Sequence, residues 1–299
     1  MSRFWILVFF LFSPALWAGD VSPAEPSPSQ GKPAFRFRHP RVLFDQGHHN
    51  VHFLTTGYLP FAKIVEQDGY RVAPIVEPFT AATLGKADVL VVVNPRSAGR
   101  EAPLPERGLP AFSLEECAAV EGWVKAGGSL LLVADHYPIG SATQRLANSF
   151  GTQMSNGWTI DPDFALPEMP NGESITYRRD QGRLGDHPIL RGRNAEERID
   201  VVETFSGQSL HGPSQATPLL LLSDRAQDEL PPDHAQKISA AGRNQGLAFR
   251  HGKGRVVMIG EAQALTSLIS DGTLTGFERP ENDNRQLVLN VMRWLSGKL

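Results

Sequence analysis

Apolar runs of strand length recur along the first half of the chain and alternate with segments of helical periodicity. The runs cover residues 41–44, 70–76, 88–93 and 130–134, and the last two are almost entirely apolar. A strand that is apolar throughout is typical of a sheet buried on both faces, as in parallel sheets covered by helices. The pattern therefore predicts an α/β fold with a mostly parallel central sheet.

Helical periodicity covers residues 56–68, the segment that begins at Ser113, and residues 283–295. Ser113 and Glu116 have the spacing of a capping box, and Ser141 with Gln144 repeats that spacing. Cys117 lies on the apolar face of the helix that follows Ser113, which indicates a core residue and not a nucleophile.

The alternation is lost between residues 152 and 198, where proline, glycine and charge dominate. We expect a small β insertion or flap there. Regular strands return at 246–250 and 255–260, and the segment HGKG between them is typical of a hairpin turn.

The first residues have the layout of a secretory signal peptide. Arg3 precedes an apolar stretch over 4–12 that is too short to span a membrane, and a cleavage site follows near Ala18. The prediction is a signal peptide over 1–18 and a periplasmic or secreted protein; an uncleaved anchor is the alternative. Residues 19–34 are rich in proline and serine and predict a disordered tether, followed by a single domain over 35–299.

Composition narrows the classes of partner. A formal net charge of −3 and a pI near 6.3 give no basic excess to meet phosphates, which argues against nucleic acid. The chain has 1 cysteine and cannot form an internal disulfide. Oligomeric state and protein partners stay open.

Polar residues follow three of the predicted strands. The carboxyl ends of parallel strands meet at one edge of a sheet, where ligands bind in α/β folds. The residues expected at this edge are Asp45, His48, His49, Asn50, Asp135, His136, Tyr137 and Glu261. Tyr137 and Trp158 are candidates for aromatic side chains on which a ligand could stack.

Asp135, His136 and Glu261 are the candidate catalytic residues, because carboxylates and imidazoles in a partly desolvated site can exchange protons near neutral pH. The same three side chains would be the ligands of a divalent metal if one binds. Their spacing matches no metal signature, so no cofactor is expected and a divalent metal is left open. The structural alternative is that strand-end Asp and Asn bond to the backbone of the next turn and that the histidines cap helices.

Six segments in order resemble the class I glutamine amidotransferase-like superfamily: VLFDQGHHN, ADVLVVVNP, GGSLLLVADHYPIG, DHPILRG, GRVVMIGEA and ENDNRQLVLNVMRWL. The nearest branch is similar to ThuA-like proteins and to the N-terminal domain of an intraflagellar transport subunit. The resemblance implies a flavodoxin-like three-layer sandwich with its site at the strand ends. It also places Asn284, next to Asp283 at the start of the last helix, among the ligand-binding candidates.

Amidotransferases of this superfamily carry a cysteine on a sharp turn after a strand, and Cys117 lies inside a predicted helix instead. Glutaminase activity is therefore not expected. Three hypotheses follow. The first is an exported domain that binds a small polar ligand, such as a carbohydrate or a cell-envelope fragment. The second is a hydrolase that uses the Asp/His/Glu cluster, and the third is a protein-interaction scaffold.

Overall fold

The computed structural model describes residues 21–28, 32–166, 172–270 and 272–299. The predicted signal peptide over 1–18 lies outside these residues. Among the described residues, no helix combines the length and the apolar character that crossing a membrane requires.

The centre of the molecule is a nine-stranded mixed sheet. Five neighbouring strands are parallel, and in sheet order they are β3 (Arg71–Ile75), β2 (Arg41–Asp45), β4 (Val89–Val93), β5 (Ser129–Val133) and β15 (Gly254–Ile259). Antiparallel strands extend it: β14 (Asn244–His251), β10 (Leu210–His211), β6 (Gln153–Met154) and β11 (Thr217–Leu221). The hairpin predicted over 246–260 is β14–β15. The α/β fold with a large, partly parallel sheet is confirmed.

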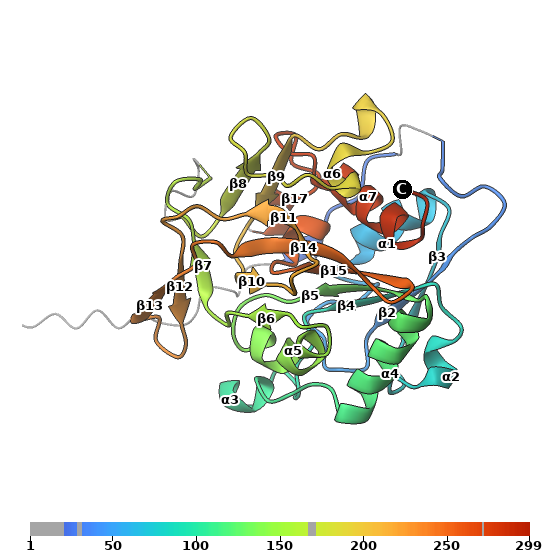
Figure 1. Ribbon diagram of the computed structural model, residues 1–299, viewed down its shortest axis with the longest axis horizontal. Coiled ribbons are helices and arrows are strands. Elements are labelled where there is room, and N and C mark those ends of the chain that lie inside the picture. Colours follow the sequence, from blue (N-terminus) through green and yellow to red (C-terminus); the bar gives the residue numbers. More distant parts are fainter. Residues whose placement is uncertain (1–20, 29–31, 167–171, 271) are drawn as a thin grey trace, which may run out of the picture.

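Helices cover both faces of this sheet (Figure 1). On one face lie α1 (Leu59–Gln67), α6 (Pro188–Arg191) and α7 (Asn284–Leu295). On the other lie α2 (Ala81–Leu84), α3 (Leu104–Arg107), α4 (Leu114–Ala126) and α5 (Ile139–Asn148). The prediction of a second capping box at Ser141 and Gln144 is wrong. The helix α5 begins at Ile139, and the Gln144 side chain accepts a hydrogen bond from the Met154 N–H instead.

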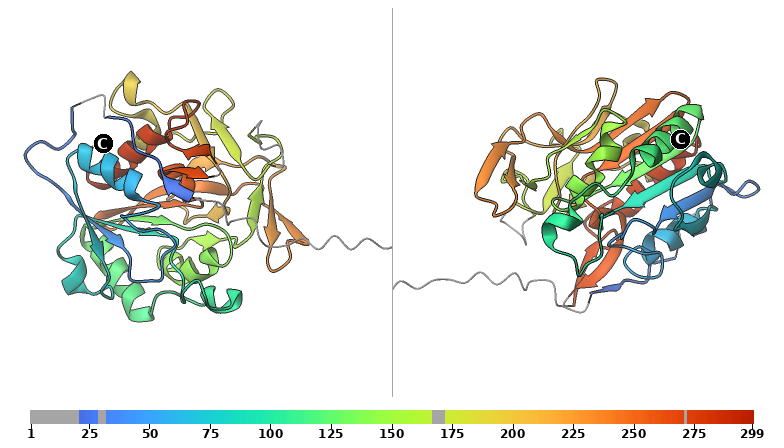
Figure 2. Two further views of the ribbon diagram at one scale, coloured as in Figure 1. Left: turned by 180° about the vertical axis from the view of Figure 1, so that it is seen from behind. Right: turned by 90° about the horizontal axis from the view of Figure 1, so that it is seen from below.

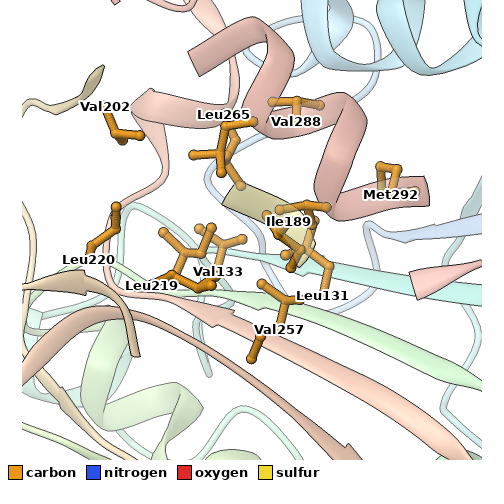
Figure 3. Packing of buried hydrophobic residues seen from close by; sticks show 14 of the residues in the cluster. Leu131, Val133, Ile189, Val202, Leu219, Leu220, Val257, Leu265, Val288 and Met292 are labelled. Carbon is orange, nitrogen blue, oxygen red and sulfur yellow. The ribbon is translucent and has the colours of Figure 1, made fainter. Parts of the chain in front are cut away.

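Every residue of β4 and β5 is buried, because side chains alternate between the two covered faces. Leu131 pairs in register with Val91 on one side and Val257 on the other, and all three point toward α7. Figure 3 shows this cluster with Val288 and Met292 of α7 above Leu131 and Val133. Leu130 and Leu132 pack on the opposite face with α4, where Cys117 is also buried.

Smaller elements surround the sheet. One sheet joins β7 (Trp158–Ile160), β12 (Gln227–Leu230) and β13 (Gln236–Ser239), and a pair joins β8 (Ile175–Arg178) and β9 (Val201–Thr204). Two single turns of 3-10 helix are η1 (Ala195–Glu197) and η2 (Gln263–Leu265). The β insertion expected between 152 and 198 is present, and it recruits the β12–β13 hairpin from farther along the chain.

The structure differs from the expected disordered tether at residues 21–28. There β1 (Val21–Pro23) adds an antiparallel strand to the hairpin of β16 (Ser267–Ser270) and β17 (Thr273–Gly276), as the view from behind shows (Figure 2). Glu25 pairs with Lys63, and the Ser27 hydroxyl donates to Glu278. A segment with few apolar side chains is ordered here because backbone hydrogen bonds to an edge strand do not require them.

Candidate functional site

Four polar side chains stand at the ends of four adjacent parallel strands. Asp45 is the last residue of β2, and Asn94 comes directly after β4. Asp135 and Glu261 are each separated from the end of their strand, β5 and β15, by one residue. Since β2, β4, β5 and β15 are neighbours in the sheet, these ends meet at one edge. The strand ends that carry Asp45, Asp135 and Glu261 lie at one edge of the sheet, as predicted. Asn94 lies at the same edge, although it was not among the residues expected from the sequence.

Asn94 and Asp135 form a reciprocal pair. The Asn94 amide group donates to Asp135 Oδ2 at 2.6 Å, and the Asp135 backbone N–H donates to Asn94 Oδ1 at 3.0 Å. Asn94 is in the left-handed backbone region with φ of 45°, which asparagine tolerates better than most residues. Asn94 comes directly after the apolar run that ends at residue 93, as Asp135 comes directly after the run that ends at residue 134. This position was the signal in the sequence that could have identified it.

Asp135 and Glu261 lie close together but differ in what they bind. Asp135 Oδ1 accepts from the Ala262 N–H at 2.7 Å, and the residue is half-buried. Glu261 is buried, and its two carboxylate oxygens accept from the Gln263 and Ala264 backbone N–H groups at 2.6 and 2.7 Å. Glu261 therefore fixes the start of η2, and Asp135 is the more exposed of the two residues.

Burial raises the pKa of both groups. The pKa of Asp135 rises to about 6, against the opposing effect of its hydrogen bonds from Asn94 and Ala262. Burial, followed by the charge of Asp135, raises the pKa of Glu261 well above its usual range. A half-buried carboxyl with a pKa near 6 can exchange protons at near-neutral pH.

An aromatic group formed by His136, Trp158 and His234 lies next to Asp135. The His136 and Trp158 rings stack with centroids 4.2 Å apart and planes at 12°, and His234 meets Trp158 edge-on at 5.3 Å. The His136 Nδ1 donates to the Tyr137 carbonyl at 3.0 Å, and burial lowers its pKa to about 4. His136 is therefore neutral at pH 7.

Two members of this region could not be found from local sequence. His234 comes from the connection between β12 and β13 and was not among the expected residues. Gln208 links the end of β5 to the loop before Trp158: its Nε2 donates to the Ala134 and Asp135 carbonyls at 2.9 Å each, and its Oε1 accepts from the Asn156 N–H.

Asp45, His48 and Asn50 come together, but they bind one another. His48 Nδ1 lies 2.8 Å from Asp45 Oδ1, and His48 Nε2 lies 3.0 Å from Glu116 Oε1. The ring packs against Phe79 and Phe112, which also stack on each other. Glu116 also completes the predicted capping box with Ser113. This buried cluster joins the end of β2 to the start of α4. The contacts of Asp45 and His48 are therefore structural, in line with the structural alternative for the strand-end residues.

The remaining candidates are scattered. His49 is exposed, with its carbonyl accepting from Arg96 Nε, and Tyr137 is half-buried beside His136. Asp283 and Asn284 bind backbone groups of β9 and the residue before it: Asp283 accepts from the Asp200 and Val201 N–H groups, and Asn284 bonds to both backbone groups of Glu203. Within the described residues, neither bonds to Asp135.

Two cavities lie away from the strand ends. One of ≈ 680 Å³ is lined by residues such as Lys32, Arg193 and Asp283, and one of ≈ 560 Å³ lies along the β7–β12–β13 sheet. In the described part of the chain, no three His, Cys, Asp or Glu side chains are grouped so that they could hold a metal ion. This applies to Asp135, His136 and Glu261 as well.

The buried His48 cluster makes stability depend on pH. Burial lowers the pKa of His48, but the hydrogen bonds and charges of Asp45 and Glu116 outweigh burial and raise it above 6.5. A raised folded-state pKa stabilises the fold below the unfolded pKa, and this stabilisation is lost as pH rises through the folded value. We expect the free energy of unfolding lost in His48→Gln to be larger at about pH 6 than at about pH 9.

Urea denaturation of both proteins at the two pH values measures this difference. His211→Gln is the matched control, because His211 is exposed and its side chain forms no hydrogen bond or ion pair within the described residues. A loss that stays constant or grows with pH would contradict the assignment of His48 as a charged, doubly paired residue.

The fold and the strand-end group define a mixed α/β domain with its candidate site at the carboxyl edge of a parallel sheet. Among solved structures, the chain is similar to the N-terminal domain of mmIFT52, with a TM-score of 0.60 and 14% identity over 86% of this chain and 97% of that domain. The predicted resemblance to the N-terminal domain of an intraflagellar transport subunit is thereby confirmed as a likeness of fold.

Other matches are more distant. A protein described as ThuA-like from Bacteroides uniformis has a TM-score of 0.45 and 12% identity, and covers 91% of this chain and 95% of its own. A protein described as a subunit of GMP synthase from Thermoplasma acidophilum has a TM-score of 0.45 and 11% identity, with 87% and 96% covered. No protein-family model matches the chain, and no curated protein matches it in sequence.

Proposed function

We propose that this chain is an exported domain that binds a small polar ligand, a carbohydrate or a cell-envelope fragment, at the strand-end group of Asn94 and Asp135. The observation that carries the proposal is the half-buried Asp135 carboxylate, held between Asn94 and the Ala262 amide and placed beside the aromatic group. Carboxylate and amide groups bind hydroxyls, and a flat ring offers a face to the apolar side of a sugar. Export rests on the signal-peptide pattern of residues 1–18.

The proposal includes a finer description of the fold, a flavodoxin-like three-layer sandwich. Its support is the order of the five parallel strands, which, numbered in chain order among themselves, is 2-1-3-4-5. That is the order of flavodoxin-like sheets, in which ligands bind outside the carboxyl ends of the strands.

Asp135 also supports a second candidate function, a hydrolase. A carboxyl whose pKa is near 6 could accept a proton from an attacking water. Glu261 is less suited to this role, because it is buried, whereas Asp135 is partly exposed. Turnover of glycans or esters that Asp135→Asn abolishes, in a protein that stays folded, would favour the hydrolase over a pure binding module.

The binding proposal predicts that Asp135→Ala weakens sugar binding by about tenfold or more, because a hydrogen bond to a charged group contributes roughly 1.5–3 kcal/mol. The measurement is the melting temperature of the mature chain with a panel of neutral and acidic sugars. A ligand at a hundred times its dissociation constant adds about 2.7 kcal/mol of stability, which moves the melt by a few degrees.

The matched control is Asp180→Ala, since Asp180 is exposed between β8 and β9 and its side chain forms no hydrogen bond or ion pair within the described residues. It should keep the full sugar-induced shift. A shift that survives Asp135→Ala unchanged would place the site elsewhere, and the absence of a shift with every sugar would refute the proposed function.

A further inference from the structure

Three arginines lie in the segment between β4 and α4, which contains α3, and none of them pairs with an acidic residue in the described part of the chain. Arg96, Arg100 and Arg107 form no ion pair with any described residue. Other arginines, such as Arg193, Arg285 and Arg293, pair with Glu197, Glu278 and Asp68, respectively. We call the three unpaired residues the arginine group.

The backbone holds this group together. The Ser97 N–H donates to the Arg107 carbonyl at 3.2 Å, which folds the loop back on itself and brings Arg96 near Arg107. The Arg96 N–H donates to the His48 carbonyl at 2.8 Å and Arg96 Nε to the His49 carbonyl at 2.9 Å. The loop is therefore tied to the end of β2.

The same loop borders the strand-end group. Arg96 comes two residues after Asn94, which binds Asp135. At the other end of the loop, Gly108 packs against Tyr137: a Cβ built on Gly108 would lie 3.1 Å from Tyr137 Cε2. The segment that carries the arginine group therefore begins beside Asn94 and ends beside Tyr137, and both of these residues adjoin the Asp135–His136 segment.

The charges in this loop are not balanced internally. Burial lowers the pKa of Arg96, and the positive charges of Arg107 and Arg100 lower it further, with Glu101 opposing them. Arg107 Nε is buried and has no hydrogen-bond partner among the described residues. Glu106 is exposed and forms no ion pair there. Like charges held together at a site edge are relieved when an anion binds between them.

We propose that the strand-end site takes a ligand that carries a phosphate or carboxylate group, and that Arg100 and Arg107, with Arg96, bind this anion. The inference rests on the proposed function for the hydroxyl-bearing part of the ligand, which Asn94 and Asp135 would hold. Guanidinium groups match the oxygen geometry of both anions. A single anionic group fits better than nucleic acid, because the chain has a net charge of −3 and the arginine group is small.

The test compares glucose, glucose 6-phosphate, glucuronate and inorganic phosphate, titrated into the full mature chain by calorimetry. The variants are Arg107→Gln and Arg100→Gln. Arg100 is exposed and bonds to no described residue, so its variant keeps the test valid if Arg107→Gln is unstable. Arg36→Gln is the matched control, since Arg36 is exposed, unpaired among the described residues and lies before the opposite end of β2.

We expect an acidic sugar to bind at least about tenfold more tightly than glucose, and either site variant to remove most of that advantage while Arg36→Gln keeps it. Preference for glucose 6-phosphate or for glucuronate identifies the anion. Glucose that binds as tightly as both acidic sugars would overturn this inference and leave the proposed function standing. Phosphate binding lost in Arg107→Gln, with no sugar bound, would support the anion site and refute the sugar proposal. Binding of no probe would overturn both.

Discussion

Asp68→Ala is expected to lower the free energy of unfolding by about 3–5 kcal/mol, because it leaves a buried arginine without its partner. Asp68 caps the end of α1 and Arg293 belongs to α7, and their side chains are 4% and 6% exposed. Arg293 Nε and Nη2 donate to the two Asp68 oxygens at 2.8 and 2.7 Å. Glu197, 3.1 Å from Arg293 Nη1, compensates the remaining charge in part.

Urea denaturation measures this loss, with Asp186→Ala as the control. Asp186 pairs with Arg191, but their side chains are 86% and 52% exposed, so we expect a change below about 1 kcal/mol. Adding Arg293→Met to Asp68→Ala should recover part of the stability, because no buried charge then remains unpaired. If Asp68→Ala cost no more than Asp186→Ala, the buried pair would not contribute to stability as described.

Leu131→Ala is expected to cost about 2–5 kcal/mol, the range for deleting a buried leucine side chain. Leu131 is fully buried in β5, in register between Val91 and Val257 and beneath α7 (Figure 3). Close-packed strands on both sides and a helix above leave little room for the cavity to collapse. The loss is read from the shift of the urea midpoint at unchanged slope.

Leu114→Ala removes the same atoms at the start of α4, where the side chain is 69% exposed. Its cost should stay within about 0.5 kcal/mol. Equal costs for the two variants would show that β5 is not the packed centre of the sheet.

The sequence was most informative where burial alone decides structure. β4 and β5 were predictable because a strand covered on both faces must be apolar at every position. The convergence of Asp45, Asp135 and Glu261 followed from the parallel order of their strands. The capping box at Ser113 was predictable because it is local, with both partners within three residues.

Features that depend on distant contacts were not predictable. His234 reaches Trp158 only because β12 pairs with β7, and no local pattern reveals that pairing. The ordering of residues 21–28 depends on an edge strand more than 200 residues away. The roles of Asp45 and His48 as buried partners required Glu116, which the sequence indicates only as a helix cap.

Glu116 connects three parts of the chain through hydrogen bonds to its carboxylate. Its carboxylate accepts the Ser113 N–H at the start of α4, the Phe79 N–H before α2, and the His48 ring after β2. Because one carboxylate accepts all three hydrogen bonds, replacing Glu116 removes the contacts of the loop after β2 and of the first turn of α4 together. Because the Arg96 N–H donates to the His48 carbonyl, a ligand bound by the arginine group would be connected through His48 to Glu116 and so to the start of α4.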